Sequence, residues 1–223
     1  QGVDLLINIS SSPYTFNKNQ KRHRVFSAHV AALRKPLVYV NNIGLQNNGK
    51  TVFTFDGGSC IYAGGERSGL PAFAAGALTR ELAPADAAGA PVSEKPDDIG
   101  ELARALLYGS GEFMRQCGVE RVVVGISGGI DSAVVAALFR RLLEPERLLL
   151  ANLPGPFTSP TTIELARRLA DGLGCYYVEL PIAASIALTR AQLDGLEIAS
   201  RSGALRTRLA LTDFMLENVQ ARD

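Results

Sequence analysis

Tryptophan is absent from this 223-residue chain, and histidine, methionine and cysteine are scarce, with two, two and three residues respectively. His23 and His29 stand six residues apart on a predicted helix, so they face different sides of it and do not form a metal-binding pair. The cysteines, Cys60, Cys117 and Cys175, are odd in number and widely separated, which fits neither a zinc site nor a disulfide framework. We therefore expect a reducing, cytoplasmic location.

An excess of charge and long apolar runs are also missing. The chain has 23 Lys and Arg residues against 22 Asp and Glu, for a net charge of +1, which gives no basic patch for nucleic acid or a membrane surface. No apolar run approaches the ~20 residues of a membrane helix. With 47% hydrophobic residues, the composition is that of a globular protein of one or two domains.

The second half of the chain alternates between helix and strand. A helix is predicted over residues 98–117, with Ile99, Leu102, Leu106 and Phe113 facing inward. Strands and helices then follow in turn at residues 121–126, 131–143, 147–153, 161–173 and 175–180. This order predicts a parallel sheet whose ligands bind at the carboxyl ends of the strands. Residues 184–210 are predicted to be a loose helical connection, followed by a helix capped by Thr212 or Asp213.

The first half mixes strands with one helix. A helix is predicted over residues 19–35, and strands are predicted over residues 3–9, 37–40, 51–55 and 59–63. The run at 3–9 is nearly all apolar, which predicts a strand buried on both faces. Because this core strand starts the chain and a helical pattern is still running at Asp223, we expect an internal piece of a longer protein. Residues 83–97 are predicted to link domains at 1–82 and 98–223.

The most informative motif lies between a predicted strand and a helix. Its glycines allow close approach of the backbone to phosphate, its hydroxyls add donors, and the helix N-terminus favours an anion. Asp131 would repel a bare phosphate, so a cation such as Mg²⁺ is expected between them. The alternative is an ordinary tight turn in which Ser and Asp cap the helix. The candidate residues are Gly125, Ile126, Ser127, Gly128, Gly129, Ile130, Asp131 and Ser132.

Residues 127–132, Ser-Gly-Gly-Ile-Asp-Ser, resemble the SGGxDS loop of the N-type ATP pyrophosphatases, which cleave ATP to AMP and pyrophosphate. Two more segments are similar to those of NAD synthetases. Residues 153–159 match the segment beside the adenosine half of ATP, with Leu153 in place of the usual Met, and residues 217–222 match the ENxQAR segment. The resemblance implies ATP bound by the loop, Mg²⁺ bound by Asp131, and deamido-NAD bound by Asn218.

Three segments of the first half resemble the later portion of the nitrilase-type glutaminase domain that is fused to glutamine-dependent NAD synthetases. They are residues 5–14 followed by Lys18 and Arg22, residues 38–44, and residues 55–59. The resemblance implies glutamine binding by Ser12 and Lys18. The Glu, Lys and Cys that catalyse glutamine hydrolysis in that family have no match here, so no catalytic residue is assigned. Cys60 is interpreted as a packed thiol.

Together these resemblances imply an α/β chain: the C-terminal half of a nitrilase-like α-β-β-α sandwich, then a parallel-sheet, Rossmann-type domain like that of adenine nucleotide hydrolases. The implied reaction is the ATP- and glutamine-dependent amidation of deamido-NAD to NAD by a homo-oligomer. The alternatives are another SGGxDS-loop amidotransferase, such as a GMP or asparagine synthetase, a non-catalytic nucleotide-binding module, and a plain carbon–nitrogen hydrolase with an unrelated tail.

Overall fold

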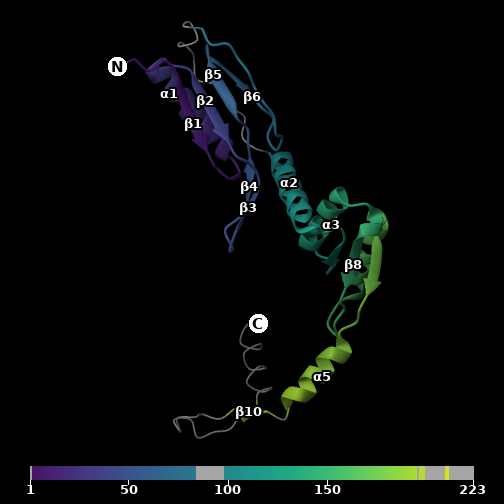
Figure 1. Cartoon of the computed structure of the whole chain (residues 1–223). Helices are drawn as coiled ribbons and strands as arrows, with labels where there is room; N and C mark the ends of the chain where they lie inside the picture. The colour runs from purple at the N-terminus through teal and green to yellow at the C-terminus, as the bar shows by residue number, and fades with distance from the viewer. Residues whose placement is uncertain (1, 84–97, 195, 199–208, 211–223) are drawn as a thin grey trace. The chain divides into compact units, whose positions relative to one another are not determined.

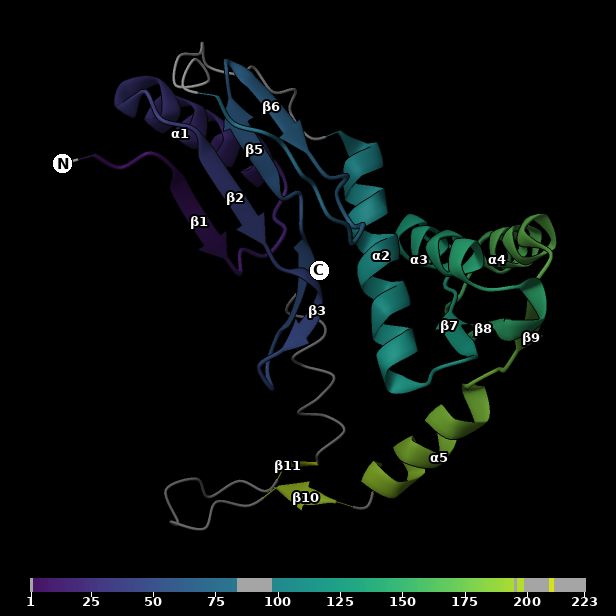
Figure 2. The same cartoon turned by 45° about the horizontal axis from the view of Figure 1, so that its top comes forward.

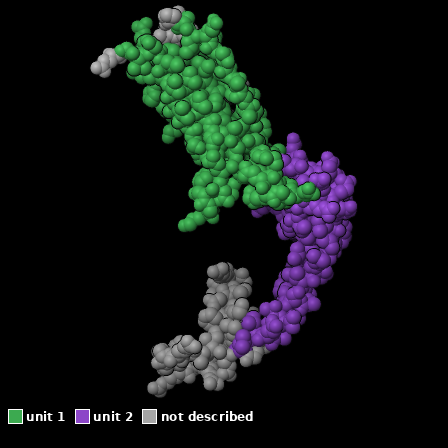
Figure 3. All heavy atoms as spheres, viewed as in Figure 1, with its two compact units in different colours: residues 1–120 green, residues 121–223 purple. Residues whose placement is uncertain are grey.

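The structure is a computed structural model that describes residues 2–83, 98–194, 196–198 and 209–210 (Figure 1). Its chain divides into two compact units, Gln1–Glu120 and Arg121–Asp223 (Figure 3), which are described separately below. Most of the predicted linker at 83–97 and the predicted helix from Thr212 or Asp213 lie outside the described residues. The proposed domain boundaries at residues 82 and 98 therefore stay a prediction.

The first unit contains a four-stranded sheet in the order β1-β2-β5-β6, with helix α1 across one face (Figure 2). Strands β1 and β2 are parallel, and the other pairs are antiparallel. Gly64 and Gly65 both have positive φ, which suits the tight turn that joins β5 to β6. The elements are β1 (Leu6–Ser10), α1 (Lys18–Leu33), β2 (Leu37–Asn41), β5 (Cys60–Ala63) and β6 (Glu66–Gly69).

The two faces of this sheet differ in burial. The face toward α1 holds a core of Val30, Leu37, Tyr39, Cys60 and Tyr62. On the opposite face, the side chains of Ile7 and Ile9 are 63% and 81% exposed. The prediction that this strand is buried on both faces is therefore wrong. Helix α1 covers the first face, and the second face is exposed at the edge strand β1, whereas β5 is buried on both faces.

A hairpin and a long helix complete the first unit. The hairpin pairs β3 (Ile43–Asn47) with β4 (Val52–Asp56), and helix α2 (Ile99–Cys117) contacts both of its strands. Asp98 caps α2 by accepting a hydrogen bond from the Glu101 amide at 2.9 Å.

Helix α2 does not present the predicted residues to the interior. Its buried residues are Ala105 and Met114, whereas Ile99, Leu106 and Phe113 are exposed. An added Cβ at Gly109 would lie 2.6 Å from Thr54 Oγ1, so the helix approaches the hairpin through small residues. The predicted inward orientation is therefore wrong for Ile99, Leu106 and Phe113, whereas the fourth predicted residue, Leu102, is half-buried. The helix faces the hairpin with Gly109, where a larger residue would collide with Thr54.

The second unit is a parallel three-stranded sheet in the order β7-β8-β9, which confirms the predicted sheet. Helices α3 and α4 lie side by side along it (Figure 2), and their alanines pack on the strands at Ala136, Ala166 and Ala170. The elements are β7 (Val122–Gly125), α3 (Ile130–Leu142), the short 3₁₀ helix Pro145–Arg147, β8 (Leu148–Asn152), α4 (Pro160–Leu173) and β9 (Tyr176–Glu179).

Beyond β9, the predicted loose connection contains helix α5 (Ala183–Asp194) and a small antiparallel ladder. The ladder pairs β10 (Glu197–Ile198) with β11 (Leu209–Ala210). In the part of the chain that the structure describes, no helix is both long and apolar enough to cross a bilayer.

His23 lies inside the core of the first unit, and its Nδ1 contacts the Tyr62 hydroxyl. Burial lowers the pKa of His23 to about 4, and the neighbouring charges of Arg67 and Arg22 add to this effect. His29, on the same helix, is exposed. The two histidines therefore face different environments, as their spacing predicts.

We expect the chain to lose stability as the pH falls from about 6.5 to about 4. In this window the unfolded chain protonates His23, from a pKa of 6.5, while the folded chain excludes that proton. The loss amounts to roughly 2 to 3 kcal/mol after allowance for partial solvent screening. Urea unfolding at pH 7 and pH 4 measures it. His23→Gln should flatten the pH dependence and His29→Gln should not; equal slopes in the two variants would contradict this assignment.

Candidate functional site

Two serine hydroxyls hold the turn between β7 and α3 in shape. Ser132 Oγ accepts a hydrogen bond from the Ser127 amide at 3.3 Å and donates one to the Gly129 carbonyl at 3.0 Å. Ser127 Oγ accepts one from the Gly129 amide at 3.3 Å. The first-turn amides, such as that of Ile130, have no intrahelical acceptor, and the helix dipole makes this end positive. The turn therefore has the geometry of an anion-binding loop.

Gly128 is the point where this loop touches the next helix. Its φ is +84°, and an added Cβ would lie 2.2 Å from the Thr162 carbonyl oxygen in the first turn of α4. Any side chain at this position would overlap with that backbone atom. The loop is therefore packed directly against the beginning of α4, and glycine is required at this position.

A pocket of about 200 Å³ opens beside the loop at the carboxyl ends of β7 and β8. Parallel sheets bind their ligands at this edge, so the position agrees with the prediction from strand order. The loop and the segment that follows β8 are separate in the sequence, and both of them line this pocket. Its lining residues are Gly125, Ile126, Ser127, Asn152, Leu153 and Thr158.

The segment after β8 is ordered by its own hydroxyl groups. Thr158 Oγ1 accepts a hydrogen bond from the Gly155 amide at 2.9 Å, which folds the segment back on itself. Ser159 then caps α4 by accepting from the Thr162 amide at 3.2 Å, and Pro160 fills the first helical position. These contacts hold Leu153 and Thr158 at the pocket.

Asn152 lines this pocket and was not predicted. It is buried at the end of β8, and its Nδ2 donates a hydrogen bond to the Ile126 carbonyl oxygen at 2.9 Å. This bond joins the end of β8 to the residue just before Ser127. The signal in the sequence was a single polar residue that ends an otherwise apolar strand.

Asp131 stands in the first turn of α3 with its side chain exposed. The helix is capped by Gly129 without a side-chain hydrogen bond, and Asp131 has no hydrogen bond or ion pair with the described residues. This arrangement disfavours the alternative in which Asp131 serves only as a cap. Within the described ranges no cluster of three or more His, Cys, Asp or Glu residues could hold a metal. A single carboxylate beside phosphate oxygens and water nevertheless suits Mg²⁺.

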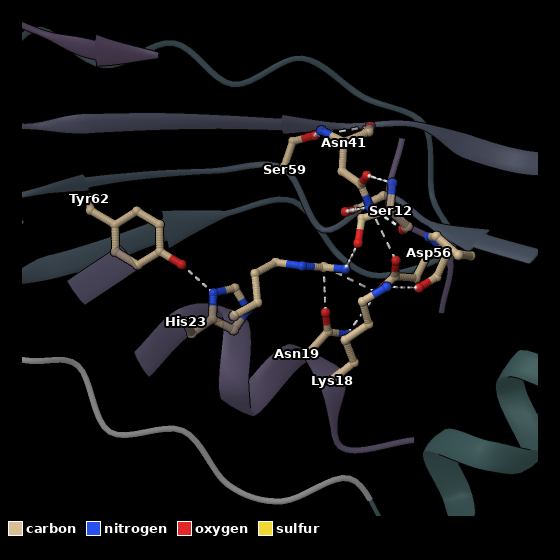
Figure 4. A network of polar contacts seen from close by, with 11 residues as sticks. Ser12, Lys18, Asn19, His23, Asn41, Asp56, Ser59 and Tyr62 are labelled. Atoms are coloured by element: carbon tan, nitrogen blue, oxygen red, sulfur yellow. Dashed lines mark hydrogen bonds and ion pairs between the residues drawn. The ribbon is translucent and has the colours of Figure 1, made fainter. Parts of the chain in front are cut away.

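In the first unit, Ser12 lies in the loop after β1 and Lys18 is the first residue of α1; both are half-buried at the edge of a polar network (Figure 4). The Ser12 amide donates to Asn41 Oδ1 at 2.8 Å, and Lys18 Nζ donates to the Pro13 carbonyl at 3.0 Å. Partial burial lowers the pKa of Lys18; the Arg22 charge adds to this, and Asp56 opposes it.

The remaining predicted residues are placed as follows. Asn218 and the segment at 217–222 lie outside the described residues. Cys60 is a free thiol that is only 2% exposed, and burial raises its pKa, which agrees with its interpretation as a packed thiol.

The sequence of this chain is similar to those of known proteins. The family model described as NAD synthase matches residues 105–223. The glutamine-dependent NAD(+) synthetase of Synechocystis sp. is 35% identical over 82% of this chain and 33% of its own length. The protein of the same name from Rhodobacter capsulatus is 34% identical over 99% of this chain and 39% of its own. The chain thus spans between a third and two fifths of the length of these relatives.

A solved structure of the same kind of protein has a similar fold. The glutamine-dependent NAD+ synthetase from Acinetobacter baumannii, in complex with adenosine diphosphate, matches 90% of this chain and 39% of its own, with a TM-score of 0.74 and 26% identity. This similarity confirms the mixed α/β fold with a parallel sheet. The family model covers more than half of the sequence and includes both segments that line the pocket. The chain belongs to the NAD synthase family.

Proposed function

We propose that the protein carrying this chain converts deamido-NAD to NAD with ATP and glutamine, releasing AMP, pyrophosphate and glutamate. The observation that carries this proposal is the pocket at the ends of β7 and β8, where the Ser-Gly-Gly loop and the segment after β8 meet. Both segments lie inside the region matched by the NAD synthase family. The A. baumannii relative was solved in complex with adenosine diphosphate, which supports binding of an adenine nucleotide, and we assign that nucleotide to this pocket.

In this proposal the nicotinate carboxylate attacks the α-phosphorus of ATP, and the bond to pyrophosphate breaks. The nitrogen of ammonia then attacks the activated carboxyl carbon, AMP leaves with the electrons of the C–O bond, and a proton is lost. Residues 125–132 bind the phosphates through backbone amides and the helix N-terminus. Asp131 is the residue that would hold Mg²⁺, which offsets negative charge on pyrophosphate when bound.

The first unit supplies nitrogen in this proposal. We assign it to the later half of a nitrilase-like sandwich in which Ser12 and Lys18 bind glutamine. Their donors, a hydroxyl in the loop after β1 and an ammonium group at the start of α1, suit an amino acid that carries a carboxylate and an amide. Asn218 is assigned to deamido-NAD, and the assembly is expected to be a cytoplasmic homo-oligomer.

Product analysis of the full-length protein that contains this sequence tests the proposal. With deamido-NAD, MgATP and glutamine labelled with ¹⁵N in the side-chain amide, we expect labelled NAD and one AMP per NAD. Aspartate or xanthosine monophosphate in place of deamido-NAD should yield no AMP. Release of ADP, or AMP formation with either of these acceptors instead of deamido-NAD, would rule the proposal out.

A further inference from the structure

A buried ion pair lies directly behind the segment that holds Ser12. Arg22 Nη1 is 3.6 Å from Asp56 Oδ2, and the two side chains are 7% and 0% exposed. Arg22 also makes two hydrogen bonds: Nη1 donates to Asn19 Oδ1 at 2.6 Å, and Nη2 donates to Ser12 Oγ at 3.1 Å. The guanidinium group also lies over the Tyr39 ring, 5.1 Å from its centre. Arg22 therefore connects a buried acid to the hydroxyl of a half-buried serine.

Asp56 is held from two other sides. Asn19 Nδ2 donates to Asp56 Oδ2 at 2.7 Å, and Asn41 Nδ2 donates to Asp56 Oδ1 at 3.2 Å. Asn41 in turn binds the backbone of Ser12 twice, donating to its carbonyl at 3.1 Å and accepting from its amide at 2.8 Å. Figure 4 shows Ser12, Asn41 and Asp56 joined in this network. Asn41 thus holds the backbone of Ser12 and Arg22 holds its hydroxyl, and both of these residues contact Asp56.

A buried ion pair adds little net stability compared with apolar residues of the same volume, because both charges lose their water. Such a pair is more easily explained as a group that fixes geometry, and here the residue that it fixes, Ser12, is half-buried while the pair is fully buried. The hydrogen bond from Arg22 occupies a lone pair of Ser12 Oγ. The Ser12 hydroxyl hydrogen must therefore point away from Arg22, and it can be donated to the neighbouring Tyr39 hydroxyl or, when a ligand is bound, to an acceptor on that ligand.

We propose that Arg22, held in place by Asp56, is a positioning residue for glutamine binding: it fixes the Ser12 hydroxyl as a donor toward the substrate. This inference rests on the proposed function, in which Ser12 binds glutamine. Arg22 itself does not contact the substrate. The planar fork of a guanidinium group serves three partners at once, here Ser12, Asn19 and Asp56, which a lysine ammonium cannot match in the same geometry.

The test is Arg22→Lys in the full-length protein, with glutamine or ammonia as the nitrogen source. The lysine keeps a positive charge beside Asp56 but loses the contact with Ser12. We expect the KM for glutamine to rise about tenfold, with kcat at saturating glutamine and the ammonia-driven rate both within about twofold of the parent. Arg24→Lys is the matched control, because Arg24 is exposed on the same helix and makes no contact with the described residues.

A double-mutant cycle with Ser12→Ala distinguishes failure of the positioning role of Arg22 from failure of the proposed glutamine site. If Arg22 acts through Ser12, Arg22→Lys should have no further effect on the KM for glutamine in the Ser12→Ala background. Additive effects, or an unchanged KM in Arg22→Lys alone, would overturn the positioning role and leave the glutamine site standing. An unchanged KM in Ser12→Ala would remove the glutamine site itself, while ammonia-driven NAD formation still reports on the synthetase reaction.

Asn19→Ala is a second test, to be used if Arg22→Lys does not fold. Asn19 is half-buried and joins Arg22 to Asp56, so its removal loosens the pair without leaving a buried charge unpaired. We expect the KM for glutamine to rise about threefold, with circular dichroism unchanged. If Arg22→Lys is unfolded by circular dichroism, the result with Asn19→Ala decides, and an unchanged KM there would overturn the proposal.

Discussion

Asp131→Asn should slow AMP formation by the full-length protein about 100-fold at saturating ATP, the size of effect seen when one charge-stabilising group is removed from an active site. The substitution keeps the shape of the side chain and removes its charge. The same variant should bind ATP more tightly than the parent in EDTA, because a carboxylate beside bare phosphates repels them. In excess Mg²⁺ the order should reverse. Calorimetric titration of ATP under both conditions measures this crossing.

Asp171→Asn is the matched control for Asp131→Asn. Asp171 is exposed, makes no side-chain contact with the described residues, and lies near the end of α4, ~18 Å along the helix from Ser159. The control changes the net charge by the same amount and should leave AMP formation and ATP affinity unchanged. Equal ATP affinity for parent and Asp131→Asn in both EDTA and Mg²⁺ would exclude a metal role for Asp131.

Gly128→Ala should weaken MgATP binding about 100-fold or more. The added Cβ would lie 2.2 Å from the Thr162 carbonyl oxygen, and the positive φ of +84° is itself unfavourable for alanine by ~1 to 3 kcal/mol. Since the backbone of α4 is fixed by its own hydrogen bonds, the loop must move away, and its amides no longer converge on the phosphates. Equilibrium binding of MgATP to the full-length protein checks this result.

Gly174→Ala provides the comparison for Gly128→Ala. Gly174 also has a positive φ, +68°, but nothing lies within 4 Å of an added Cβ at this end of α4. This variant should lose about 1 kcal/mol of unfolding free energy and keep its affinity for ATP. If the two variants bind ATP equally well, contact between the loop and α4 has no part in nucleotide binding.

The sequence predicted the parallel sheet of the second unit because each strand is a largely apolar run that is followed by glycine, proline or a polar residue. Strands β3 and β6 were not predicted. Their sequences, Ile-Gly-Leu-Gln-Asn and Glu-Arg-Ser-Gly, have little preference for strand, and they are extended because β4 and β5 pair with them. Pairing with a partner strand is a tertiary effect that a local pattern does not contain.

The candidate site also contains residues that the sequence predicted and residues that it did not. The loop at residues 127–132 was identified because all of its residues are consecutive. Asn152 and the pair of Arg22 with Asp56 were missed, because each acts across the fold. Asn152 binds the carbonyl of Ile126, which is 26 residues away, and nothing near either residue in the sequence indicates the contact. Positioning residues of this kind become visible only when the chain is folded.

The contact between Gly128 and the first turn of α4 also limits how the loop can be grafted onto another protein and which substitutions it accepts. A designer who grafts residues 127–132 onto another parallel sheet would transfer the hydroxyls and the glycines but not the surface against which the loop rests. The smallest transferable unit therefore runs from β7 through the beginning of α4 and includes Thr162. For the same reason, substitutions that reshape the first turn of α4 should appear together with compensating changes in the loop.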